Sequence, residues 1–293
     1  MDRRDFARQL AAGAALGAVP AWAQPPVRPK PATPPTPAAD HDMAVMTRFV
    51  DTLAGGDPAE RARIVPARPR QVALVAYPGF FPLDLLGTKA VFDDLLMTEV
   101  HIVAKDRTPI AAGRHVQLVP NHTFESCPAE LDVLFVPGGG AGTVAAMQDE
   151  ALLAFLRRQA ERARFVTSVC TGALVLGAAG LLRGYRATTH WVTHEVLADF
   201  GAIPVTERVV QDRNRITGGG VTAGIDFGLT IAAQLAGETY ARAVQLNIEY
   251  APAPPFAAGT PEGAGPRVSG AMREMYADLV AGSRAVAARA GAR

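Results

Sequence analysis

From Arg70 onward, short apolar runs typical of buried strands alternate with segments of helical spacing, and this alternation constrains the fold most strongly. Strands separated by helices of about ten to fifteen residues predict right-handed βαβ units around a mainly parallel sheet. The expected core strands are "QVALVAY", "EVHIVAK", "LDVLFVP" and "RFVTSV", with a shorter one in "HVQLVPN". The expected helices are "LDLLGTKAVFDDLL", "EALLAFLRRQAERA", "TGALVLGAAGLL" and "VTAGIDFGLTIAAQLAG". "IPVTERVVQDRNRITGG" predicts an antiparallel hairpin. The fold class is therefore α/β.

Length and charge exclude several classes of partner. With 293 residues, 49% hydrophobic residues and a formal net charge of +1, the chain suits one large domain with a sizeable core. A charge this close to zero gives no reason to expect a nucleic acid or an anionic membrane as partner. We expect a small-molecule substrate instead.

The first 23 residues have the form of a targeting segment. Arg3-Arg4-Asp5-Phe6 precedes the weakly apolar stretch "LAAGAALGAV", and Ala21-Trp22-Ala23 resembles a cleavage site. This pattern predicts a twin-arginine signal peptide and a periplasmic mature protein; a disordered basic start is the alternative. No later segment is long and apolar enough for a bilayer span, so no membrane association is expected after signal removal.

The rest of the chain divides by composition. Residues 24–40 are a Pro/Ala-rich linker, and residues 41–66 form a lead segment with one short helix before Gly55-Gly56-Asp57-Pro58. Residues 67–268 form the expected catalytic domain. Residues 269–293 are expected to form a last helix and tail.

Cys170 lies where the strand "RFVTSV" gives way to a helix, a place where parallel α/β sheets gather their ligands. A thiolate at a helix N-terminus has a lowered pKa, and the small residues that follow permit a nucleophile elbow, a sharp strand-to-helix bend. Two alternatives compete with catalysis. Cys170 is a small buried hydrophobe, or it forms a disulfide with Cys127, the only other cysteine.

Two further segments belong to the same edge of the sheet. "FVPGGGAG" places Gly139 and Gly140 after a core strand, where backbone N–H groups can stabilise a developing anion. A phosphate-binding loop is the alternative, but the Gly-Lys-Ser/Thr of such loops is absent. Asp84 follows the first strand, as a buried acid or as an ordinary acid at a helix start.

Four stretches together resemble the ThiJ/PfpI family of the class I glutamine amidotransferase-like superfamily, and within it the isonitrile hydratases. They are "VALVAYPGFFPLDLLG", "LDVLFVPGGG", "VTSVCTGALVLGAAGLLRGYRATTHW" and "ITGGGVTAGIDFGL". The resemblance implies a flavodoxin-like three-layer αβα sandwich, a homodimer and no cofactor. It also implies Cys170 as nucleophile, Asp84 as acid and Thr171 as a third catalytic residue. The implied reaction adds water to an isonitrile and gives an N-substituted formamide.

Other residues near these motifs have weaker assignments. His190 resembles the family's distal histidine, so it either orients the site or is a structural imidazole. His190 and His194 have the spacing of a two-histidine zinc site but no evident third ligand, and we expect no metal. Tyr77, Phe80 and Trp191 are candidates for an apolar pocket wall.

Three rival functions remain open on the sequence alone. Other members of the family act on reactive carbonyls, although those relatives usually carry Glu where this chain has Asp84. Cys170 could also serve redox sensing through its own oxidation. A periplasmic ligand-binding domain without catalysis is the third.

Overall fold

The computed structural model describes residues 43–113 and 115–291. The expected signal peptide and the linker of residues 24–40 lie outside the described residues. Of the described residues, those from Thr47 onward belong to one compact unit, and this second unit of the chain contains the sheet and the candidate site residues. Within the described residues, no helix combines the length and apolar character of a membrane span.

A seven-stranded sheet forms the centre of this second unit, with the order β10-β11-β7-β6-β1-β2-β5. All neighbouring pairs are parallel except the hairpin β10–β11, which confirms the predicted antiparallel element. The strands are β1 (Arg70–Val75), β2 (Thr98–Ala104), β5 (His122–Thr123), β6 (Val133–Val136), β7 (Phe165–Val169), β10 (Val209–Asp212) and β11 (Arg215–Gly218). The central strands β6 and β7 are buried along their whole length, as their continuous apolar sequences require.

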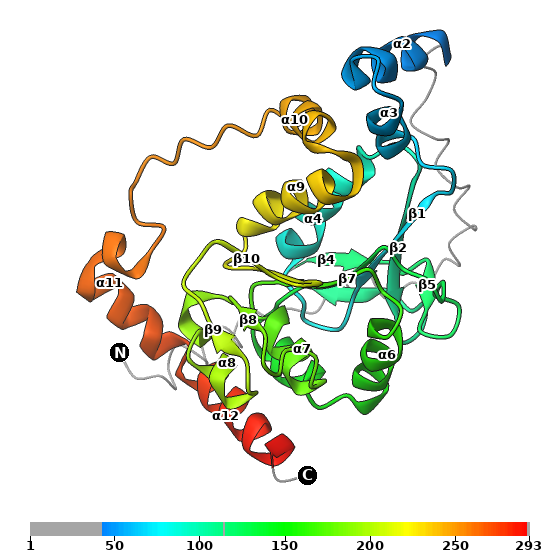
Figure 1. Ribbon diagram of the computed structural model, residues 1–293. Helices are drawn as coiled ribbons and strands as arrows, with labels where there is room; N and C mark the ends of the chain where they lie inside the picture. The colour runs from blue at the N-terminus through cyan, green and yellow to red at the C-terminus, as the bar shows by residue number, and fades with distance from the viewer. Residues whose placement is uncertain (1–42, 114, 292–293) are drawn as a thin grey trace, which may run out of the picture. The chain divides into compact units, whose positions relative to one another are not determined.

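Helices cover both faces of the sheet (Figure 1). One layer contains α3 (Pro58–Ile64), α4 (Pro82–Asp93), α9 (Ala223–Ala236) and α10 (Glu238–Asn247). The other contains α5 (Ala141–Ala146), α6 (Glu150–Ala160), α7 (Gly172–Ala178) and α12 (Ala277–Gly291). The expected flavodoxin-like three-layer αβα sandwich is thus confirmed.

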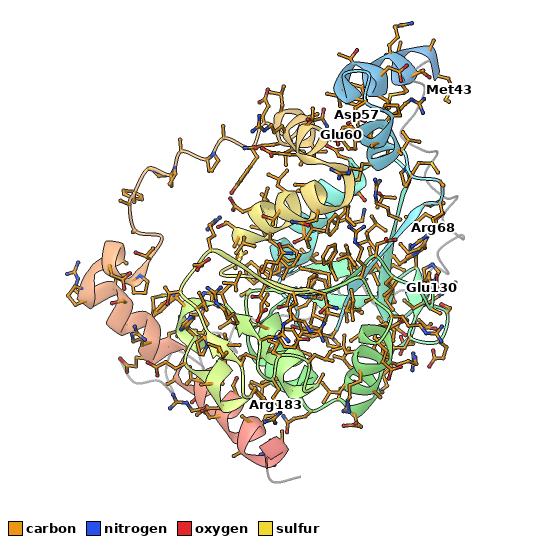
Figure 2. The ribbon with its side chains drawn as sticks, viewed as in Figure 1. Met43, Asp57, Glu60, Arg68, Glu130 and Arg183 are labelled. Atoms are coloured by element: carbon orange, nitrogen blue, oxygen red, sulfur yellow. The ribbon has the colours of Figure 1, made fainter. Side chains whose placement is uncertain are left out.

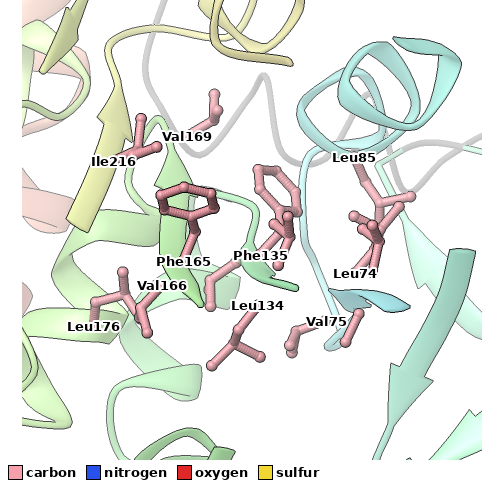
Figure 3. Close-up of a cluster of buried hydrophobic side chains, with 14 of the residues drawn as sticks. Leu74, Val75, Leu85, Leu134, Phe135, Phe165, Val166, Val169, Leu176 and Ile216 are labelled. Atoms are coloured by element: carbon pink, nitrogen blue, oxygen red, sulfur yellow. The ribbon is translucent and has the colours of Figure 1, made fainter. Parts of the chain in front are cut away.

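The core lies between the sheet and these two layers. Leu74, Phe135 and Val166 come from three adjacent strands and have no exposed surface. Figure 3 shows their side chains among Leu85, Leu176 and other buried aliphatic groups. Phe135 also packs on Phe227 of α9, with ring centroids 5.6 Å apart. Burial of these groups fixes the positions of the strand ends that carry the site.

The lead segment contains two helices instead of the single predicted one. Helix α2 (Met43–Ala54) ends before the Gly-Gly pair, as expected, but Asp57 and Pro58 then begin α3. The Asp57 side chain accepts a hydrogen bond from the N–H of Ala59, and Pro58 occupies the first helical turn. Asp57 and Glu60 are labelled at this helix in Figure 2. The Asp57-Pro58 dipeptide, which looks like a helix terminator in the sequence, is therefore also a helix start signal.

The C-terminal segment likewise forms a helix earlier than predicted. Helix α11 (Pro261–Met275) begins before residue 269, where the last helix was expected to start, and α12 follows it directly. The Thr260 hydroxyl accepts a hydrogen bond from the Gly263 N–H, which caps α11, and Gly265 kinks it at a φ of 78°. The expected boundary at residue 268 therefore falls inside α11.

The smaller elements lie outside the main sheet. "HVQLVPN" contributes only β4 (Val116–Leu118), which pairs with β3 (Ile110–Ala112). A second two-stranded pair joins β8 (Arg186–Ala187) to β9 (Ile203–Pro204). Between them lie the 3-10 helix η3 (Trp191–Thr193) and α8 (Val196–Asp199).

Candidate active site

Three loops meet at the carboxyl edge of the sheet because β1, β6 and β7 are adjacent and parallel. Asp84 lies in the first turn of α4 after β1, Gly138 follows β6, and Cys170 follows β7. The chain passes from β1 to β2 on one side and later to β6 on the other, which makes this edge a topological switch point. The fold therefore brings together Asp84 and Cys170 from segments far apart in the sequence.

The backbone bends sharply at Cys170, as the predicted nucleophile elbow requires. Its φ is 57°, in the left-handed region that non-glycine residues rarely adopt. Its N–H donates to the carbonyls of Gly218 (3.1 Å) and Gly219 (2.7 Å), and its own carbonyl accepts from the Thr189 hydroxyl (2.8 Å). These contacts hold a strained residue in place, a feature common at functional sites. Helix α7 itself begins at Gly172, one residue after the start of the predicted segment "TGALVLGAAGLL".

Asp84 is a buried acid and not an ordinary surface charge. Its side chain has no exposed surface, and its Oδ2 accepts a hydrogen bond from the Gly138 N–H at 2.8 Å. Oδ1 is also buried and has no hydrogen-bond partner among the described residues. Burial raises the pKa of Asp84 to about 7, although the Gly138 N–H and a hydrogen bond with Cys170 oppose that rise. The carboxyl group is therefore partly protonated at neutral pH.

The pKa of Cys170 is raised, which corrects the expectation of a lowered value. The residue is only 6% exposed, and burial followed by the nearby Asp84 charge raises the pKa of its thiol well above the ordinary range. Hydrogen bonds from the Thr171 N–H and hydroxyl act in the opposite direction but are outweighed. Cys170 and Asp84 therefore form a coupled pair that retains a proton at neutral pH.

Thr171 and the glycines pack into one tight arrangement. The Gly139 N–H donates to the Thr171 hydroxyl at 3.0 Å. This N–H, which was expected to stabilise a developing anion, therefore already has a hydrogen-bond acceptor within the protein. Gly140 is exposed at the start of α5. The backbone N–H of Gly138 and the hydroxyl of Thr143 complete the arrangement. Neither was predicted, because only the folded chain brings them to Asp84 and Thr171.

The three expected pocket residues separate into two groups. Tyr77 and Phe80 are almost fully buried, with ring centroids 6.4 Å apart, and the Tyr77 hydroxyl donates to the Pro137 carbonyl at 2.7 Å. They belong to the packed core beside Asp84. Trp191, in η3, lines a cavity of about 1070 Å³.

This η3 cavity lies beside the elbow, because Thr189 and Gly219 line it and also bond the Cys170 backbone. Its far wall comes from the two C-terminal helices, chiefly through Arg273, Ala277, Val280, Ala281 and Arg284. The Arg273 guanidinium stacks over the Trp191 ring at 5.0 Å from the centroid. The cavity thus combines an aromatic face with charged rims.

His190 is held by contacts of its own. Its Nδ1 accepts from the Val192 N–H at 3.4 Å, and its ring packs near Trp191 and Tyr276. Burial lowers the pKa of His190, which favours the neutral ring. These contacts give it a structural role at the start of η3, and an orienting role stays a prediction.

The remaining candidates concern metals and disulfides. Within residues 43–113 and 115–291, no group of three or more His, Cys, Asp or Glu side chains could hold a metal ion. Cys127 and Cys170 are both free, so the disulfide alternative is wrong. Burial raises the pKa of the Cys127 thiol to about 11, in keeping with a structural residue.

Comparison with known proteins agrees with this geometry. The model of the DJ-1/PfpI family matches residues 70–234, and the chain belongs to that family. Isonitrile hydratase of Pseudomonas putida is 55% identical over 192 residues, which are 66% of this chain and 83% of that protein. A crystal structure of a THiJ/PfpI family protein from Pseudomonas syringae matches with a TM-score of 0.75 and 45% identity, covering 86% of this chain and 98% of that one.

The same domain also occurs in proteins of another class. The HTH-type transcriptional regulator GbdR of Pseudomonas aeruginosa is 31% identical over 152 residues, which are 51% of this chain and 41% of the regulator. Membership of the family therefore leaves the activity to be argued from the site.

Proposed function

We propose that this chain is an isonitrile hydratase, an enzyme that adds water to R–N≡C and gives R–NH–CHO. The observation that carries the proposal is the buried pair of Asp84 and Cys170, with the pKa of the acid raised to about 7. The similarity to the Pseudomonas putida hydratase supports it. An isonitrile carbon is poorly electrophilic until it is protonated, so the reaction needs an acid beside the nucleophile.

Protonation and attack form the first half of the reaction. Asp84 gives its proton to the isonitrile carbon while the Cys170 thiolate attacks that carbon, which yields the thioimidate R–N=CH–S–Cys and a carboxylate. An acid of ordinary pKa would hold this proton in about one molecule in a thousand at pH 7. Burial raises the pKa of Asp84 to about 7, so a much larger fraction of the acid is protonated at neutral pH.

Hydrolysis forms the second half. The Asp84 carboxylate takes a proton from water as the hydroxide adds to the thioimidate carbon, and it then returns that proton to nitrogen. The resulting R–NH–CH(OH)–S–Cys collapses to the formamide as its hydroxyl proton passes to sulfur. Transfer of that proton from the Cys170 thiol to the Asp84 carboxylate then restores the thiolate and the acid with which the cycle began. Backbone N–H groups of the Thr171 turn and of Gly140 are the candidates for stabilising the charge that develops as this intermediate collapses.

The test is to assay purified protein with cyclohexyl isonitrile and, in parallel, with methylglyoxal, and to detect N-cyclohexylformamide by chromatography. Cys170→Ala should abolish formamide production, and Asp84→Asn should reduce it by at least about 100-fold, the usual contribution of a general acid. Cys127→Ala is the matched control and should retain full turnover. Consumption of methylglyoxal alone would favour the rival carbonyl chemistry, and full turnover by Asp84→Asn would remove the acid assignment.

We also propose that the protein is exported by the twin-arginine route and pairs as a homodimer. Export is supported by Arg3-Arg4 and the Ala21–Ala23 motif. Pairing is supported by apolar side chains exposed near the C-terminus, including Leu246 at 78% and Phe256 at 76%. Cell fractionation tests export, and light scattering of the purified protein tests pairing. A cytoplasmic location or a monomeric mass would contradict the respective proposal.

A further inference from the structure

Three buried hydroxyl groups form a chain of close contacts beside the nucleophile. The Tyr77 hydroxyl lies 3.5 Å from the Thr143 hydroxyl, which lies 2.7 Å from that of Thr171. All three residues are buried, and Thr143 has no exposed surface. Thr171 follows Cys170 directly, and hydrogen bonding by its hydroxyl acts to lower the pKa of the Cys170 thiol, although burial outweighs this effect. Because water has little access to this chain, its hydrogen atoms must be shared among the acceptors that the protein supplies.

Each hydroxyl has one hydrogen to donate, which limits the arrangement. Tyr77 donates to the Pro137 carbonyl at 2.7 Å. Thr143 makes a short hydrogen bond to the Gly139 carbonyl, and Thr171 lies farther from that same carbonyl, at 3.1 Å. Assigning the short bond to Thr143 leaves the Thr171 hydrogen shared between the Thr143 oxygen and the Cys170 sulfur.

Ionisation of the Cys170 thiol determines which acceptor receives the Thr171 hydrogen. A thiolate is a stronger acceptor than a neutral hydroxyl, since hydrogen bonds to charged groups are about twice as strong as neutral ones. The Thr171 hydrogen can turn to the sulfur only if the Gly139 carbonyl has another donor. Thr143 is that donor.

We propose that Thr143 is a positioning residue, which satisfies the Gly139 carbonyl and so frees the Thr171 hydroxyl to stabilise the Cys170 thiolate. Without the Thr143 hydroxyl, the Thr171 hydrogen is drawn to the unsatisfied Gly139 carbonyl and is lost to the sulfur. The inference rests on the role proposed for Cys170 as nucleophile, but it does not depend on the substrate.

Other titratable groups also lie near the Cys170 thiol, so they must be the same in all the variants that are compared. Asp84 on α4 raises the pKa of the Cys170 thiol, and Cys170 in turn contributes to the raised pKa of Tyr77 after β1. His190 lies next to Thr189, whose hydroxyl bonds the Cys170 carbonyl. Substitutions at Thr143 leave all three groups in place, so a change in the thiol titration reports on the hydroxyl chain.

The experiment measures the rate of iodoacetamide alkylation of Cys170 against pH, in the full chain carrying Cys127→Ala so that one thiol remains. Thr143→Val should raise the apparent pKa of alkylation by about one unit, which slows the reaction roughly tenfold below that pKa. Thr143→Ser should restore the profile of the parent. Thr167→Val is the matched control, because Thr167 is an equally buried threonine on β7 whose hydroxyl bonds the Leu134 carbonyl at 2.9 Å.

A second set of variants tests whether Thr143 acts on the thiol through the Thr171 hydroxyl. In Thr171→Val protein, the same change at Thr143 should have no further effect on alkylation, because the hydroxyl it frees is absent. If Thr143→Val fails to fold, Thr143→Ala replaces it with the same expectation. An unchanged profile in the Val or Ala variant would overturn the proposal, as would a Ser variant as impaired as Val or an equal shift in Thr167→Val. Loss of isonitrile turnover plays no part in these outcomes, so the proposed function fails or stands separately.

Discussion

Burial decides the chemistry of the individual residues at the site. Cys170 lies at a strand-to-helix turn that normally favours a thiolate, yet its surroundings favour the protonated thiol. The same surroundings keep Asp84 partly protonated at neutral pH. The two effects are complementary, because one proton can pass between sulfur, carboxyl and substrate without leaving the site. Reactivity of Cys170 is thus expected to depend on Asp84 and Thr171 more than on the helix.

Trp191 is the residue for which we predict an effect on substrate choice. It lines the η3 cavity under Arg273, so Trp191→Ala should raise KM for cyclohexyl isonitrile by roughly 10- to 200-fold, as expected for lost apolar contacts. KM for methyl isonitrile should change little, because a methyl group has little apolar surface to bury against the ring. Steady-state kinetics with both substrates check this, with Val119→Ala as control, because Val119 is exposed and does not line the η3 cavity. An equal loss for the two substrates would show that Trp191 has only a structural role.

The residues predicted from sequence and those missed differ in a physical way. Cys170, Asp84 and Thr171 lie within contiguous motifs at strand ends, so the sequence alone points to them as candidates. Thr143 carries no such signal, because a threonine in the first turn of a short helix is ordinary. Its contact with Thr171 depends on the register of β6 against β7. The burial of the thiol, which reverses the expected direction of its pKa shift, also follows only from packing.

Among the elements, α7 depends on a close approach to the end of β6. A Cβ atom at Gly172 would overlap the Val136 carbonyl and lie 2.7 Å from that of Pro137. Only glycine permits the helix to begin there, and this start fixes the Cys170 elbow. The long elements were predictable because their apolar runs are buried by the sheet. Helix α3 and the start of α11 were missed because Pro and Gly near a helix start resemble a loop.

Gly172→Ala therefore tests the helix start. The added methyl group must push α7 away from β6, and overpacking of this kind costs about 1–3 kcal/mol. We expect a lower urea midpoint and loss of most isonitrile turnover, measured on the same preparation. Gly270→Ala, in α11, is the control, because a Cβ there meets nothing within 4 Å and alanine favours a helix. Wild-type values for Gly172→Ala would show that the elbow tolerates a wider separation of α7 from β6.

At the scale of the whole molecule, the buried acid makes the stability of the fold depend on pH. The folded pKa of Asp84 is about 7, well above the ordinary value of 3.8, so the folded chain binds this proton more tightly than the unfolded chain. The stabilising contribution of the proton is complete below about pH 4 and is lost as the pH rises through about 7. The reactive carboxyl is thus kept at a cost to stability at neutral pH.

This linkage predicts a difference between wild type and Asp84→Asn in urea unfolding from pH 5 to pH 8. Asparagine can still accept from the Gly138 N–H but cannot ionise. The difference in the free energy of unfolding, variant minus wild type, should therefore increase by as much as about 1 kcal/mol per pH unit up to pH 7 and should be constant above it. Cys170→Ala retains the buried carboxyl and should keep the wild-type slope. Parallel curves for wild type and Asp84→Asn would mean that Asp84 is already ionised in the folded protein, and a carboxylate could not protonate the isonitrile carbon.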